Sequence, residues 1–192
     1  MEVNFMINDY EASKPITTDA TFDSTTASND DVVSTLNGLI ETCKDGQEGF
    51  KEAAEGVERS DLKSLFYEFS QQRAQFAGEL QQLVQGLGGD PGNSGSMAGA
   101  LHRGWINIKS AVMGKDEAAV LNECERGEDS AKNAYKSALE EALPANVLET
   151  VQTHYTAIQS AHDRVKALRD ASKNSDDDDT RSDRSNTAST SF

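Results

Sequence analysis

Four apolar stripes of the sequence are each interrupted near the middle by one polar residue. Together these four side chains could bind a metal ion or form a buried network of hydrogen bonds and ion pairs. Within each stripe, hydrophobic residues recur at steps of three and four, the spacing of one helix face. The interrupting residues are Gln47, Arg73, Glu128 and His162. Because mid-helix residues lie at similar heights in an up-and-down bundle, we expect these side chains to share one buried polar layer.

The first interpretation of this layer is structural. Dimetal bundles of the ferritin type use one Glu from each of two helices and a Glu-x-x-His pair from each of the other two. This sequence contains no Glu-x-x-His pair, and Arg73 would bring a permanent cation into the layer, which opposes a divalent metal. An ion pair of Arg73 with Glu128 or Glu125, completed by hydrogen bonds from Gln47 and His162, satisfies the same buried charges without a cofactor.

The alternative is a degenerate metal site with a redox or storage role. Its candidate ligands are Glu48, Glu125, Glu128 and His162, and its metal would be iron, manganese or zinc. Carboxylate oxygens and imidazole nitrogens are suitable ligands for these ions. We predict the structural layer, and with it a non-enzymatic protein without catalytic residues, and keep the metal site as the alternative.

A third interpretation centres on the segment around the only tryptophan. His102, Arg103 and Trp105 could line a site for a small molecule or a partner, or they could pack a short helix over the bundle. Gly127 indicates close packing, because glycine in a helix interior costs about 1 kcal/mol relative to alanine. We expect Trp105 or Arg73 to approach it. The sequence has neither a GxSxG motif nor a phosphate-binding glycine loop.

The elements that must position these residues are helices. The apolar stripes cover residues 36–57, 62–87, 120–138 and 148–169, and a shorter helix is predicted over 97–113. Short connections join the first to the second stretch and the third to the fourth, which makes each pair an antiparallel hairpin. No strand-like alternation of useful length appears. The sequence therefore predicts an all-α four-helix bundle with an extra short helix between the second and third long helices.

The two ends of the chain differ from its middle. Residues 1–30 and 172–192 are rich in Ser, Thr and Asp and lack sustained hydrophobic periodicity, so we predict disordered tails around a bundle of residues 31–171. The tails carry −7 of the formal net charge of −15, and the bundle is itself acidic. A surface of that sign repels nucleic acid and anionic lipid.

The sequence predicts no membrane-spanning segment, no secretory signal and no metal-binding cysteines. No apolar run approaches the roughly 18 residues that span a bilayer, and the acidic first residues do not resemble a secretory signal. Cys43 and Cys124 lie in helix interiors without metal-binding spacing, which predicts reduced, buried thiols. We expect a cytoplasmic homo-oligomer without membrane or nucleic-acid partners.

Five segments of the chain resemble a known family. They are LNGLIETCKDGQEGFKEAAEGV (36–57), QQRAQFAGELQQLVQGLGG (71–89), GSMAGALHRGWINIKSAV (95–112), ECERGEDSAKNAY (123–135) and AHDRVKALRD (161–170). In this order and spacing they resemble the bacterial family known as domain of unknown function 2383. The resemblance implies a ferritin-like four-helix bundle in a bacterial cytoplasm with a stress-related role. It supplies no catalytic residues, and the lack of Glu-x-x-His pairs departs from dimetal ferritins.

Overall fold

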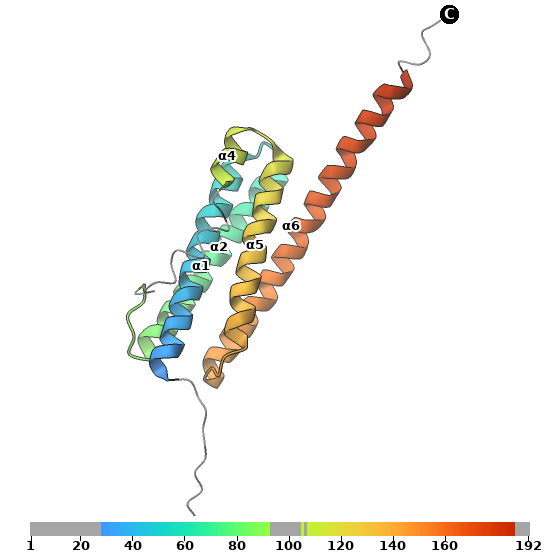
Figure 1. Cartoon of the computed structure of the whole chain (residues 1–192). Helices are drawn as coiled ribbons and strands as arrows, with labels where there is room; N and C mark the ends of the chain where they lie inside the picture. The colour runs from blue at the N-terminus through green and yellow to red at the C-terminus, as the bar shows by residue number, and fades with distance from the viewer. Residues whose placement is uncertain (1–27, 93–104, 106, 187–192) are drawn as a thin grey trace, which may run out of the picture.

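Residues 28–92, 105 and 107–186 are described by a computed structural model, with side chains described as far as residue 172. In chain order the helices of this part are α1 (Asn29–Gly56), α2 (Ser60–Gly86), α4 (Ile108–Met113), α5 (Glu117–Leu139) and α6 (Ala145–Asn186). The described residues contain no strand, so the all-α prediction is confirmed. The short α4 lies between the second and third long helices, as the sequence predicts (Figure 1). It begins at Ile108, so Trp105 and Asn107, which the prediction over 97–113 placed in the helix, precede it in a bend and a turn.

Local sequence signals explain where two of the helices begin. The hydroxyl of Ser28 accepts a hydrogen bond from the backbone N–H of Asp31 at 3.2 Å, and a carboxylate oxygen of Asp116 accepts one from Ala119 at 3.0 Å. Both are N-caps, which satisfy backbone donors that have no partner within the helix. The first helix thus begins at Asn29.

The long helices form two hairpins. α1 packs along α2, and α5 packs along α6, in each case over a short connection that makes the pair antiparallel. α1 also packs against α5, which joins the hairpins, whereas α2 and α6 approach each other least among these neighbours. The short α4 covers one end of α1 and α5 (Figure 1).

Buried apolar residues form two separate clusters, one in each half of the bundle. The first includes Leu36, Ile40, Phe76, Leu80, Tyr135, Val151 and Ile158. The second includes Phe50, Leu62, Phe66, Leu121 and Val165. On α1, α2 and α5 the two clusters are separated at the predicted polar residue, whereas on α6 His162 follows Ala161 of the second cluster. Cys43 and Cys124, one in each cluster, are free and buried, as predicted.

The last helix continues well beyond the expected end of the bundle. α6 reaches Asn186 and in Figure 1 runs past the ends of the other helices. Of the two expected tails, residues 28–30 form the N-cap and start of α1, and the backbone of residues 172–186 belongs to α6. Residues 1–27 and 187–192 lie outside the described residues, so their disorder stays a prediction. Within the part of the chain that is described, no helix is both long and apolar enough to cross a membrane.

Candidate functional site

A buried ion pair joins α2 to α5 between the two apolar clusters. Nη2 of Arg73 donates to both carboxylate oxygens of Glu128, at 2.7 and 2.8 Å, and Nη1 donates to Oε1 of Gln72 at 2.7 Å. Arg73 is 1% exposed and Glu128 is 0% exposed. Burial raises the pKa of Glu128 because the charged carboxylate loses hydration, and the attraction of Arg73 opposes this shift.

Apolar neighbours also hold the guanidinium in place. Cζ of Arg73 lies 5.9 Å from the ring centroid of Phe50 and 5.7 Å from that of Phe76, within the range of cation–π attraction. Gly46 of α1 leaves room for the aliphatic part of the side chain, since a Cβ there would lie 3.3 Å from Cγ of Arg73. The middle of the bundle is thus filled by an ion pair set between aromatic rings.

The other two residues expected in the polar layer lie beside this pair. Gln47 is half-buried, and its backbone carbonyl accepts a hydrogen bond from the hydroxyl of Ser70 at 2.8 Å. His162 is buried, at 7% exposure, but its hydrogen-bonding contacts lie between α5 and α6. The structure therefore brings Arg73 and Glu128 into direct contact and places His162 in a neighbouring cluster.

The candidate metal ligands are divided among three places. Glu125 and His162 are close to each other, whereas Glu128 is bonded to Arg73. Glu48 is exposed and lines a surface pocket of about 360 Å³ beside Trp105. The four candidate ligands are thus not gathered into one site.

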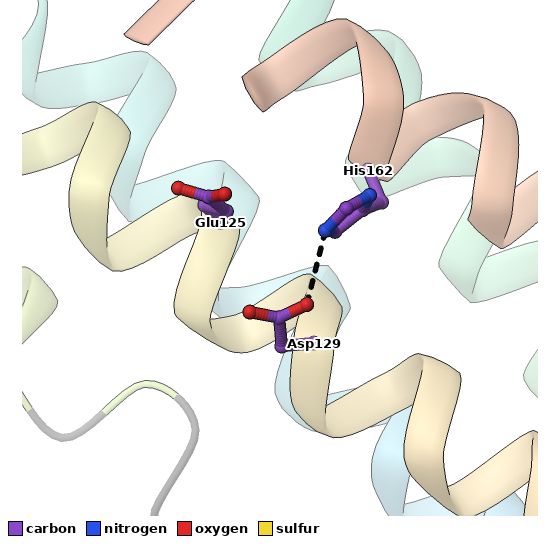
Figure 2. Close-up of side chains that lie close together, drawn as sticks. All are labelled: Glu125, Asp129 and His162. Atoms are coloured by element: carbon purple, nitrogen blue, oxygen red, sulfur yellow. Dashed lines mark ion pairs between the residues drawn. The ribbon is translucent and has the colours of Figure 1, made fainter. Parts of the chain in front are cut away.

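The cluster that contains Glu125 and His162 lies between α5 and α6 (Figure 2). Glu125 and Asp129 are one turn apart on α5, and one ligand atom from each of these three residues lies within 4.8 Å of the other two. Nε2 of His162 is 3.0 Å from Oδ1 of Asp129, and its Nδ1 is 3.0 Å from Oδ1 of Asp163. The Asp129 side chain is 55% exposed, so the cluster opens to solvent on one side.

Two cations border this cluster. Nη1 of Arg169 forms an ion pair with Oε2 of Glu125, while Nε and Nη2 of Arg169 donate to Oδ1 of Asp170 at 3.0 and 2.6 Å. Nζ of Lys132 lies 3.4 Å from both ring nitrogens of His162. The carboxylates of the cluster are therefore partly neutralised by the protein itself.

A hydrogen-bonded chain that the sequence analysis missed joins one residue from each long helix. Sγ of Cys43 in α1 lies 3.1 Å from Oη of Tyr135 in α5, and this Oη lies 3.2 Å from Nδ1 of His154 in α6. Nε2 of His154 lies 2.7 Å from Oε2 of Glu79 in α2. The imidazole is 1% exposed and stacks on Phe76, with ring centroids 3.9 Å apart. The chain leads from a buried thiol to a partly exposed carboxylate.

Burial sets the protonation states along this chain. It raises the pKa of Cys43 to about 11 and the pKa of Tyr135 well above its usual value, because both groups would be charged when deprotonated. Burial lowers the pKa of His154, while the hydrogen bond from His154 lowers the pKa of Glu79. A neutral imidazole beside an ionised carboxylate is the state that these shifts favour.

Trp105 explains the glycine in the middle of α5. Its ring fills the space between Gly127 of α5 and Gly49 of α1, and a Cβ at either position would overlap the indole. The ring also meets Phe50 edge-on, with centroids 4.9 Å apart. The expected approach of Trp105 to Gly127 is confirmed. His102 and Arg103, the other residues of the possible binding segment, lie outside the described residues.

The sequence match identifies the group of proteins to which the chain is related. Residues 31–141, more than half of the chain, match the family described as Domain of unknown function (DUF2383). The chain belongs to this family. The family resemblance inferred from the sequence is confirmed, and the match of this DUF2383 protein extends over α1, α2, α4 and α5. The resembling segment 161–170 in α6 lies outside the match. No curated protein matches the chain.

Proposed function

We propose that this DUF2383 protein is a non-catalytic helical bundle whose buried ion pair keeps its two hairpins in register. The observation that carries the proposal is the contact of Arg73 with both carboxylate oxygens of Glu128 in the middle of the bundle. In a dimetal bundle the inward-facing carboxylates bind the ions. Here the inward-facing Glu128 is occupied by a permanently charged side chain of the same chain.

The geometry of the pair supports a role in register. Arg73 belongs to the first hairpin and Glu128 to the second, and both are buried in a layer between two apolar clusters. A shift of α2 against α5 by one turn would separate the charges by about 5 Å. Separation would leave each charge buried without its partner, which is strongly unfavourable.

The unfolding free energy in the presence of chelator tests this role. With EDTA present, we expect wild-type protein to keep its stability and Glu128→Gln to lose about 3–5 kcal/mol, the usual effect of removing one partner of a buried ion pair. The exposed Glu48→Gln is the matched control and should change stability by less than about 0.5 kcal/mol. If EDTA alone lowered the wild type to the level of Glu128→Gln, a metal at Glu128 would carry the stability instead.

Self-association, a cytoplasmic location and a stress-related role stay predictions; a light-scattering mass equal to the 20.8 kDa of one chain would contradict the first. The metal-binding alternative finds its support away from the middle of the bundle, in the cluster of Glu125, Asp129 and His162.

A further inference from the structure

We infer that Glu125, Asp129 and His162 form a site for one first-row divalent transition ion, with zinc as its representative, between α5 and α6. The site is separate from the central ion pair and leaves the proposed structural role of that pair unchanged. It differs from the ligand set expected from the sequence, because Asp129 takes part, while Glu48 and Glu128 do not.

The packing of α5 against α6 already brings the three candidate ligands close together. Glu125 and Asp129 are four residues apart and share a face of α5, and His162 meets them from the antiparallel α6 (Figure 2). Ligand atoms around one ion at bond lengths of about 2.0–2.2 Å lie roughly 3–3.5 Å apart. Nε2 of His162 and Oδ1 of Asp129 are at 3.0 Å, and the full set lies within 4.8 Å.

A carboxylate outside the set orients the imidazole. Oδ1 of Asp163 lies 3.0 Å from Nδ1 of His162, and Oδ1 of Asp129 lies 3.0 Å from Nε2. With an ion bound at Nε2, Nδ1–H would donate to Asp163. Histidines that bind metals almost always give their other N–H to a carboxylate, a carbonyl or water in this way. Asp163 is thus placed to hold the imidazole in position when Nε2 binds an ion.

The coordinating atoms of the three side chains indicate which class of metal ion the site would bind. Two carboxylate oxygens and one imidazole nitrogen suit zinc, manganese or iron, whereas calcium and magnesium favour oxygen ligands throughout. The Asp129 side chain is 55% exposed, so water has access to the remaining coordination positions. Three protein ligands with room for water differ from a structural zinc site, in which four protein ligands surround the ion.

Binding of an ion must displace two cations. Arg169 would leave Glu125, but it keeps its hydrogen bonds to Asp170 at 2.6 and 3.0 Å. Lys132, whose Nζ is 4.0 Å from Oδ1 of Asp129, has a side chain that is 26% exposed and can turn into solvent. Metal binding is therefore an exchange of a protein cation for a metal ion at Glu125.

Zinc competition with a chromophoric chelator, on full-length chain stripped with EDTA, tests the site. We expect one equivalent of zinc in the wild type and at least about tenfold weaker binding in Asp129→Asn and His162→Gln. Asp163→Asn should weaken binding about 10- to 100-fold, the usual effect of removing such an orienting group. Arg169→Gln should tighten binding, because the competing cation is gone. Far-UV circular dichroism of each variant confirms that it is folded.

His154→Gln is the matched control, since it changes the other buried histidine of α6 and should leave zinc affinity unchanged. Absence of zinc binding by the wild type, or unchanged affinity in Asp129→Asn, would overturn the site. Asp129 is exposed, so its substitution tests the site even if a His162 variant fails to fold. Weaker zinc binding in Arg169→Gln would contradict the proposed displacement of Arg169 from Glu125 by the metal ion. The stability test at Glu128 is made in EDTA, so the two proposals can fail separately.

Discussion

Tyr135 and His154 can share their hydrogen bond in only one direction while the imidazole is neutral. Nε2–H of His154 donates to the Glu79 carboxylate, so Nδ1 must accept from the phenol, and the phenol oxygen in turn accepts from the Cys43 thiol. Protonation would turn Nδ1 into a donor and force the phenol to donate to sulfur, a weak acceptor. At the scale of single residues, the hydrogen bonds from Cys43 to Glu79 therefore favour a neutral His154.

This preference predicts how stability depends on pH. Because burial lowers the pKa of His154 below its usual value of about 6.5, the unfolded chain binds the proton more readily. The contribution is fully present above about pH 6.5 and is lost as the pH falls toward the pKa of the folded state. We expect the free energy of unfolding in urea to fall more steeply between pH 7.5 and 5 in wild type than in His154→Gln. Parallel curves would show that His154 does not titrate in this way.

The sequence contained part of this information. Steps of three and four from Val151 reach His154 and Ile158, so a buried His154 could have been recognised from the stripe of α6. Asp129 could not, because it lies on an exposed position of α5 and meets His162 only through the packing of the two helices. Tertiary packing, which a single sequence does not display, decides which polar residues become partners.

At the scale of the elements, the tryptophan segment and the long helices fit together through glycines. Gly127 and Gly49 bring the backbones of α5 and α1 against the Trp105 ring. The four amphipathic stripes and the exceptional Gly127 predicted both the helices and this close approach, since each feature is local in sequence. The same local reasoning does not give the angle or the depth at which the ring enters.

Substitution of Gly127 by alanine should destabilise the protein despite the better helix propensity of alanine. The new Cβ would overlap Trp105, and overpacking of this kind costs about 1–3 kcal/mol. Gly78, a glycine inside α2 with no atom near its would-be Cβ, is the matched control and should gain up to about 1 kcal/mol on the same change. Urea unfolding measures both, and Trp105 emission should shift only in Gly127→Ala. Equal effects at the two sites would contradict the packing.

At the scale of the whole molecule, the central ion pair connects hairpins that otherwise meet mainly through α1 and α5. α2 and α6 have few close approaches, and the contact from Arg73 of α2 to Glu128 of α5 adds a further link between the hairpins. The sequence predicted a polar interruption at mid-height from the stripes alone. It left open which of Glu125 and Glu128 would pair with Arg73, because the two carboxylates share a helix face.

A double-mutant cycle at the central pair tests the account most directly. Arg73→Met, Glu128→Leu and the double variant would be compared with wild type by urea unfolding in EDTA. We predict that each single change lowers the free energy of unfolding by about 3–5 kcal/mol, because one buried charge is left alone, and that the double variant recovers most of this loss. A stable Arg73→Met variant, or a double variant whose loss equals the sum of the single losses, would contradict the account.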